Sequence, residues 1–185
     1  MRLFIAINFP VEIKESLQTL INELHDNSFS GTFSTVQNLH LTLAFLGECD
    51  GRETALVKSV LKRLEYESFS LTFGKTGRFR REEGDVRWIG VRKNEALARL
   101  QRDLTDRLRE AGFRPDEREF RPHVTLGRRV NLRQGYSPQE PAPLTFDVIS
   151  VELMKSERIQ GKLTYTAVYN KNFATSKSEI SKKSF

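Results

Sequence analysis

Asn38-Leu-His40-Leu-Thr42-Leu-Ala-Phe-Leu-Gly47 is matched further along the chain by Arg121-Pro-His123-Val-Thr125-Leu-Gly-Arg128. Both stretches have the apolar and β-branched character of short strands. Residues two apart on a strand point to the same face, so His40 shares a face with Thr42, and His123 shares one with Thr125. Two of the three histidines of the chain lie in this repeated pattern, which makes it the strongest functional signal in the sequence.

Size and composition indicate one globular domain. At 185 residues the chain is long enough to bury a core, and 38% hydrophobic with 29% charged residues is typical of a soluble folded protein. No apolar stretch approaches the length of a membrane span, and the opening apolar run lacks the features of a signal peptide. A single cysteine, Cys49, excludes an internal disulfide and a cysteine-based zinc site. We therefore expect a cytoplasmic protein that binds no membrane.

The net charge of +6 and the pI of about 9.6 favour a polyanionic partner. Arginines gather in two groups, the first made of Arg78, Arg80, Arg81, Arg87 and Arg92, the second of Arg114, Arg118, Arg121, Arg128, Arg129 and Arg133. An ordinary solvated surface is the alternative, because glutamates and aspartates are interspersed in both groups. The second group surrounds His123, which makes it the more informative one.

Hydrophobic periodicity predicts alternating strands and helices. Besides the two motif strands, the expected strands cover 2–8, 32–36, 69–73, 86–91, 144–153 and 163–169, and the expected helices begin at Pro10, after the Asp50-Gly51 turn and at Asn94. The apolar positions of 144–153 change phase by one residue near Val148 and Ile149. That change predicts a β-bulge, or a strand that passes from one packing environment to another.

Three segments are expected to lie outside this framework. The arginine-rich segment 74–84 is expected to form a mobile loop or hairpin that contacts the polyanionic partner. Residues 134–143 hold three of the six prolines and should form an irregular surface loop. Residues 171–185 are expected to be a loosely ordered basic tail.

The order of elements indicates two related halves. An opening strand, a long helix, a His-x-Thr strand and a later strand occur within residues 1–84 and again within 85–170. We therefore predict an α+β fold of two pseudo-symmetric α/β lobes. Each lobe would have an antiparallel-rich sheet with helices on its outer side, and strands could exchange between lobes. Residues 1–170 would form a single bilobal domain whose central cleft brings both histidines and both threonines together.

Two imidazoles beside one phosphorus can divide acid and base catalysis between them. The neutral ring accepts a proton from attacking water, and the charged ring donates one to the departing alkoxide; a pKa near 6.5 permits either form near neutral pH. The hydroxyls of Thr42 and Thr125 can donate hydrogen bonds to the non-bridging phosphate oxygens. Hydroxyl donors and a nearby arginine would balance the charge, so the sequence predicts neither metal nor cofactor.

Other interpretations of these residues remain open. A lone His-x-Thr is usually structural, and threonine is common in strands. A zinc site would need a third ligand, and no carboxylate lies at a supporting spacing beside either motif. Phe45 shares its expected face with Leu41 and Leu43, which favours core packing over base stacking.

The two motifs resemble the paired His-x-Thr-x motifs of the 2H phosphoesterase superfamily. Their flanking sequences, Arg2-Leu-Phe-Ile-Ala-Ile, Ala-Phe-Leu-Gly47 and Leu-Gly-Arg128, resemble the RNA 2′,3′-cyclic phosphodiesterase family, also called 2′-5′ RNA ligase. The resemblance covers roughly residues 1–170. It implies hydrolysis of a 2′,3′-cyclic phosphate at an RNA end to a 2′-phosphomonoester.

The resemblance also implies roles for individual residues. His40 would donate a proton to the leaving 3′ oxygen and His123 would activate water, whereas the residues alone give only the pair. Arg128 matches a basic position of the family. Strict alternation places Arg128 on the face opposite His123, so a role in substrate binding depends on the strand ending at Gly127, as the first motif strand is expected to end at Gly47.

The expected partners are RNA or oligonucleotide ends carrying 2′,3′-cyclic phosphate, including tRNA fragments, and we expect a monomer. Ligation through a 2′-5′ bond is a secondary activity that the resemblance allows. Two alternatives remain. The first is a non-catalytic RNA-binding module on the same scaffold, and the second is a phosphodiesterase for another cyclic phosphodiester such as ADP-ribose cyclic phosphate.

Overall fold

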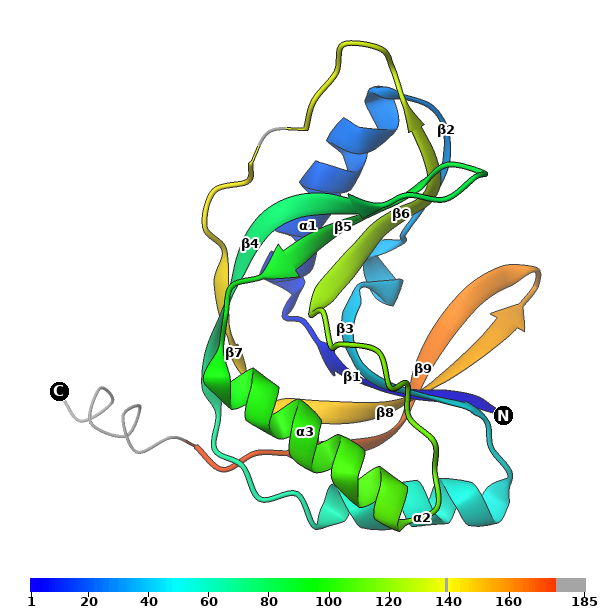
Figure 1. The fold of residues 1–185 in the computed structure, drawn as a ribbon, viewed down its shortest axis with the longest axis vertical. Coiled ribbons are helices and arrows are strands. Elements are labelled where there is room, and N and C mark those ends of the chain that lie inside the picture. The colour runs from blue at the N-terminus through cyan, green and yellow to red at the C-terminus, as the bar shows by residue number, and fades with distance from the viewer. Residues whose placement is uncertain (139, 176–185) are drawn as a thin grey trace, which may run out of the picture.

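Two antiparallel sheets stand one above the other in Figure 1 and form the framework of the protein. The structure is a computed structural model that describes residues 1–138 and 140–175. The first sheet has the strand order β3-β1-β8-β9, made of β3 (His40–Glu48), β1 (Arg2–Asn8), β8 (Ser150–Ile159) and β9 (Lys162–Asn172). The second has the order β2-β6-β5-β4-β7, made of β2 (Ser28–Phe33), β6 (His123–Leu132), β5 (Asp85–Val91), β4 (Phe69–Phe79) and β7 (Thr145–Val148).

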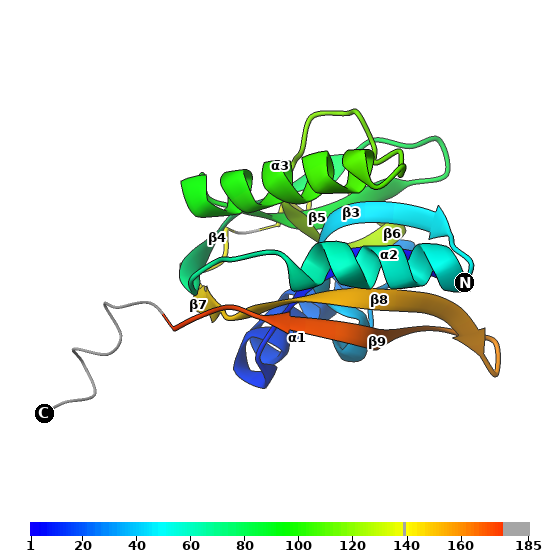
Figure 2. The ribbon, with the colours of Figure 1, turned by 90° about the horizontal axis from the view of Figure 1, so that it is seen from below.

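Helices cover the two sheets on different sides. Helix α1 (Val11–Asp26) packs on β2 and β6 of the five-stranded sheet. Helices α2 (Gly51–Lys62) and α3 (Glu95–Glu110) pack on each other and contact β9 and β3 of the four-stranded sheet (Figures 1 and 2). A single 3-10 turn, Val36–Asn38, precedes β3. The predicted α+β class with two antiparallel-rich sheets is thus confirmed.

The first strand is buried on both faces, as its sequence predicts. Leu3, Ile5 and Ile7 belong to the main core, while Phe4 and Ala6 form a smaller buried cluster with Met154 on the opposite face. Strand β1 accordingly lies inside its sheet, between β3 and β8. A strand with two apolar faces is stable only where both faces are covered.

Strands are exchanged between the two halves of the chain. Strands β2 and β4, from the first 84 residues, lie in the sheet that holds β5 and β6, whereas β8 and β9 join β1 and β3. The crossing occurs at Ile149, which is exposed between β7 of one sheet and β8 of the other. The phase change near Val148 therefore marks a chain that passes between two sheets, not a bulge. The division at residue 84 and the extent of the bilobal domain stay predictions.

Several expected boundaries were wrong. Strand β6 does not end at Gly127 but continues to Leu132, and β3 runs one residue beyond Gly47. Strand β4 continues to Phe79, so that segment 74–84 is the end of a hairpin with β5. The irregular segment 134–143 lacks helix and strand at all of its described positions.

The start of the C-terminal tail is ordered, contrary to expectation. Strand β9 extends to Asn172 and Ala174 pairs with Glu67. Phe173 stacks on Phe69 and lies beside Tyr66. The remainder of the predicted loose tail, 176–185, lies outside the described residues.

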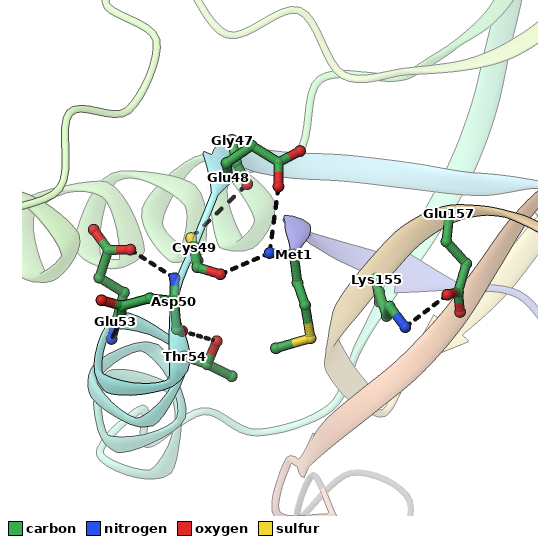
Figure 3. A network of polar contacts seen from close by, with 9 residues as sticks. All are labelled: Met1, Gly47, Glu48, Cys49, Asp50, Glu53, Thr54, Lys155 and Glu157. Carbon is green, nitrogen blue, oxygen red and sulfur yellow. Dashed lines mark hydrogen bonds and ion pairs between the residues drawn. The ribbon is translucent and has the colours of Figure 1, made fainter.

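Short polar contacts fix the beginning of α2 and the residue before β1 (Figure 3). The expected turn at Asp50-Gly51 is the N-terminus of the helix: Asp50 accepts a hydrogen bond from the Glu53 amide, and the Glu53 side chain accepts one from the Asp50 amide, both at 2.8 Å. This capping box satisfies amides that would otherwise lack partners. The Met1 amino group donates to the Cys49 carbonyl at 2.8 Å, which joins the ends of β1 and β3.

Candidate active site

The two His-x-Thr motifs lie at the start of β3 and β6, one in each sheet. These strands contact each other across the two sheets, and both views show the start of β6 close to β3 (Figures 1 and 2). The charge of His123 acts on the titration of His40, so the two rings lie within electrostatic range of each other. The two motif strands therefore meet between the sheets, while a cleft shared by both histidines and both threonines stays a prediction.

Each histidine is oriented by the backbone carbonyl two residues before it. Nδ1 of His40 lies 2.7 Å from the Asn38 oxygen, and Nδ1 of His123 lies 2.6 Å from the Arg121 oxygen. A carbonyl only accepts hydrogen bonds, so Nδ1 carries the proton in both rings. In the neutral rings, Nε2 is then the nitrogen available for proton transfer.

The threonines differ in their contacts. Thr42 Oγ1 lies 3.0 Å from His40 Nε2, which places hydroxyl and imidazole side by side as the shared face predicts. Thr125 pairs with Trp88 across the sheet, and its carbonyl accepts a hydrogen bond from the Ser34 hydroxyl at 2.7 Å. Both threonines are half-buried.

Aromatic side chains flank both histidines, a feature that the sequence analysis missed. The His40 ring contacts Phe4 and Tyr165, with centroids 4.8 and 5.1 Å away, and these two rings also contact each other at 5.0 Å. The His123 ring meets the edge of Phe79 at 5.2 Å, with Trp88 at 6.1 Å. Phe4 and Trp88 lie on β1 and β5, next to the motif strands, whereas Tyr165 and Phe79 come from β9 and β4, which are further away in the sheets. Local sequence patterns give no signal for these last two.

Asn38 links the first motif to the neighbouring hairpin. Its side-chain amide donates to the Leu163 carbonyl at 2.8 Å, and its side-chain oxygen accepts from the Tyr165 amide at 3.2 Å. The Asn38 carbonyl also accepts the hydrogen bond from Nδ1 of His40. Asn38 therefore fixes the position of His40 relative to β9. The sequence placed Asn38 in the motif without indicating this role.

Register shifts bring Phe45 and Arg128 to the strand faces that hold the motif histidines. In both β3 and β6, the histidine and threonine are followed by two consecutive buried residues, Leu43-Ala44 and Leu126-Gly127. The strand pairings shift at these places, so the alternation reverses. Phe45 and Arg128, each five positions after its histidine, are consequently exposed.

Two expectations change as a result. Phe45 does not pack in the core: it is 57% exposed, and its ring lies 6.2 Å from Phe4, on the side of His40. Arg128 lies on the same face as His123 although the strand continues beyond Gly127, because the bulge reverses the alternation. Arg129, next to it, has a φ of 54°, which accommodates the extra residue.

Burial and neighbouring charge lower the pKa of His40. Desolvation is the largest cause, and the positive charges of Arg128, Lys14 and His123 act in the same direction. The hydrogen bond to the Asn38 carbonyl opposes this shift. The neutral form of His40 is therefore favoured in the free protein at neutral pH.

We expect His40 to titrate below 6.5 in the free protein and at a higher pH when inorganic phosphate is bound, because an anion favours the imidazolium. The Arg128→Gln variant should raise the pKa of His40, since it removes a positive charge. Proton-detected NMR of the imidazole carbons across pH 5–8 would measure both shifts. Arg129→Gln is the matched control, and an unchanged His40 titration in Arg128→Gln would contradict the proposed placement of Arg128.

Gly77 makes room for the Trp88 ring. A Cβ atom at Gly77 would lie 2.3 Å from Trp88 Cη2, a distance that requires the ring to move. We expect Gly77→Ala to destabilise the fold by about 1–3 kcal/mol and to lower turnover, because Trp88 and Phe79 support His123. Gly74→Ala on the same strand is the control, since the nearest atom there is 3.6 Å away. Thermal denaturation would measure the loss of stability, and kinetic assays would measure the loss of turnover. Equal stability and equal turnover of the two variants would contradict the role of Trp88.

The described residues contain no cluster of three or more histidine, cysteine or acidic side chains that could hold a metal ion. The predicted absence of a metal and of a cofactor stays a prediction. Within the same part of the chain, no helix combines the length and apolar character needed to cross a membrane.

The arrangement of the two sheets and their helices is also found in solved structures. Escherichia coli LigT in complex with 3′-AMP superposes with a TM-score of 0.80 at 29% identity, over 93% of this chain and 97% of the other. TT0787 of Thermus thermophilus superposes with a TM-score of 0.77 at 26% identity, over 95% and 99% of the two chains.

The chain belongs to the 2′-5′ RNA ligase superfamily, whose family model matches residues 9–160. An RNA 2′,3′-cyclic phosphodiesterase of Thermotoga maritima is 36% identical over 131 residues, which cover 69% of this chain and 70% of the relative. A protein of the same name from Archaeoglobus fulgidus is 34% identical over 130 residues, 69% of this chain and 72% of the relative. The family resemblance inferred from the motifs is thus confirmed.

Proposed function

We propose that this protein hydrolyses the 2′,3′-cyclic phosphate at an RNA end to a 2′-phosphomonoester, without a metal ion, through His40 and His123. The observation that carries the proposal is the convergence of two His-x-Thr strands from separate sheets, each with its histidine oriented through Nδ1. The relatives named RNA 2′,3′-cyclic phosphodiesterase support the substrate class.

The proposed reaction is an in-line displacement at phosphorus. Neutral His123 accepts a proton at Nε2 from a water molecule whose oxygen forms the new bond to phosphorus. The bond from phosphorus to the 3′ oxygen breaks, and His40 donates the proton from its Nε2 to that oxygen. The 2′ ester bond remains intact, which gives a 2′-phosphate and a free 3′ hydroxyl.

The assignment of acid and base follows the family resemblance. His40 must be protonated to act as the donor, whereas burial and neighbouring cations favour its neutral form in the free protein. The negative charge of a bound cyclic phosphate opposes this effect and stabilises the imidazolium. Substrate binding would then convert His40 into the form that can donate.

Thr42, Thr125 and Arg128 complete the proposed site as substrate-binding groups. The two hydroxyls donate hydrogen bonds to non-bridging oxygens, where negative charge increases as water attacks. The guanidinium of Arg128 supplies positive charge from the cleft face. The exposed Phe45 would contact the nucleoside.

The direct test uses purified protein, EDTA and a nucleoside 2′,3′-cyclic phosphate. Turnover to the 2′-phosphate would support the proposal, and a 3′-phosphate product would reject its regiochemistry. Binding without turnover would favour a non-catalytic RNA-binding module instead. A much faster reaction with ADP-ribose cyclic phosphate would identify that class of substrate as the preferred one.

We propose a cytoplasmic monomer that acts on RNA ends, tRNA fragments among them. Joining of RNA ends through a 2′-5′ bond would use the same acid and base in the reverse of transesterification. Hydrolysis is the simpler activity, because it needs water rather than a second RNA end.

A further inference from the structure

A wide groove of about 1230 Å³ lies beside the candidate site, at the ends of two hairpins. The β4–β5 turn, the bulge of β6 and the β8–β9 hairpin form its walls, and the two hairpins extend toward the same side of the molecule in Figures 1 and 2. Its charged lining consists of Arg80, Arg81, Glu82, Glu83, Arg128, Arg129 and Arg158. Five arginines and two glutamates give the lining a net charge of +3.

The arginine charges of this groove are not neutralised by ion pairs. Within residues 1–138 and 140–175, none of the five forms a salt bridge to a carboxylate. Arg81 and Arg158 bond only to carbonyl oxygens, and Arg129 bonds to the Thr32 hydroxyl at 3.3 Å. By contrast, Arg78 and Arg87, on the same hairpin, both pair with Asp85. The groove arginines thus keep their charge available for an external anion.

The groove adjoins the candidate site through Arg128 and Leu163. Arg128 lines it, and the charge of Arg128 lowers the pKa of His40. Leu163 lines it as well, and the Leu163 carbonyl receives a hydrogen bond from Asn38, whose own carbonyl orients His40. A ligand whose reacting phosphate lies between the two histidines can therefore extend past Arg128 into the groove.

We propose that this groove binds the phosphodiester backbone of the RNA strand on the 5′ side of the terminal nucleotide. The inference rests on the proposed function, because it places the reactive end of that strand at His40 and His123. Arginines without carboxylate partners along an open channel suit a flexible strand that carries one negative charge per phosphate. The protein would then bind an oligonucleotide end more tightly than a mononucleotide.

The test compares two triple variants of equal charge. The groove variant is Arg80→Gln, Arg81→Gln and Arg158→Gln, and it leaves Arg128 in place. The control variant is Arg52→Gln, Arg99→Gln and Arg102→Gln, which removes three exposed arginines from α2 and α3. Fluorescence anisotropy would measure binding of a 5′-labelled single-stranded RNA octamer that ends in a 2′-phosphate, over a range of salt concentrations.

We expect the groove variant to bind the octamer about 10-fold more weakly and its salt slope to fall by about two, since each phosphate contact on a single strand contributes about 0.7 to that slope. The control variant should match the wild type. Hydrolysis of a nucleoside 2′,3′-cyclic phosphate should proceed at the same kcat/KM in both variants.

Equal affinities and equal salt slopes for the two triple variants would overturn the groove proposal. A wild-type protein that fails to hydrolyse the mononucleotide would instead overturn the proposed function. The binding comparison does not require turnover, so it would still decide whether the groove holds the strand. The two proposals can therefore fail separately.

Discussion

Replacing either His40 or His123 by alanine is expected to lower kcat/KM for a nucleoside 2′,3′-cyclic phosphate by at least about 100-fold, because each positioned acid or base contributes about 10²–10⁴-fold. Both rings are oriented by a carbonyl at Nδ1 and keep Nε2 for the substrate. The double variant should be little worse than either single variant, since the two groups act in one step.

His25→Ala is the matched control for these variants. The side chain of His25 is 69% exposed on α1, and it contacts Asp26 and Phe33, neither of which belongs to a His-x-Thr motif. We expect wild-type kinetics for this variant. Circular dichroism would verify that all the histidine variants remain folded, and retained activity in His40→Ala or His123→Ala would remove that histidine from the mechanism.

Replacing Thr42 or Thr125 by valine is expected to lower kcat by about 10- to 100-fold while KM changes less. Valine keeps the branched shape of threonine and removes the hydroxyl donor, and the loss of one preorganised donor to a developing oxyanion costs about 10²–10³-fold in buried sites. The half-buried position of both threonines places the expected loss at or below the lower end of that range.

The two threonine variants should differ in one further respect. Thr42 contacts His40 Nε2 at 3.0 Å, so Thr42→Val should also change the titration of His40. Thr125→Val should leave that titration unchanged. Thr19→Val, on the exposed surface of α1, serves as the control for the loss of a threonine hydroxyl. An undiminished kcat in both motif variants would exclude the hydroxyls as phosphate ligands.

The sequence predicted the parts of this structure that depend on periodicity. Apolar residues on both faces of 2–8 correctly placed that strand inside a sheet, and Asn94 caps α3 through the amide of Leu97 as expected. The phase change at Val148 correctly marked a change of packing environment. Each of these features can be read from a short stretch of sequence, because apolar periodicity and capping residues are local signals.

The cleft-facing positions of Phe45 and Arg128 could not be predicted by alternation. A bulge inserts one residue and inverts every later side chain, and strict period-two counting contains no information about where this occurs. The signal was present in the comparison of the motifs: both have leucine followed by a small residue, Ala44 or Gly127, immediately before the inverted position. Two adjacent buried positions are incompatible with a regular strand that is covered on one face.

The exchange of strands between sheets was beyond the reach of local patterns for a different reason. The pairing of strands depends on packing throughout the core rather than on neighbouring residues. Strand β1, for example, pairs with β8, whose residues lie about 150 positions later in the chain. Tyr165 reaches His40 only because β9 pairs with β8. Residues that are distant in sequence thus complete the surroundings of the first histidine.

The pairing of β1 with β8 also constrains how this protein is made. Strand β1 carries apolar side chains on both faces, and Arg2–Ala6 cannot acquire their second neighbour until Glu152–Ser156 have been translated. Until then β1 is an exposed apolar segment that can associate with other chains. Chaperone contacts during translation should accordingly concentrate on β1.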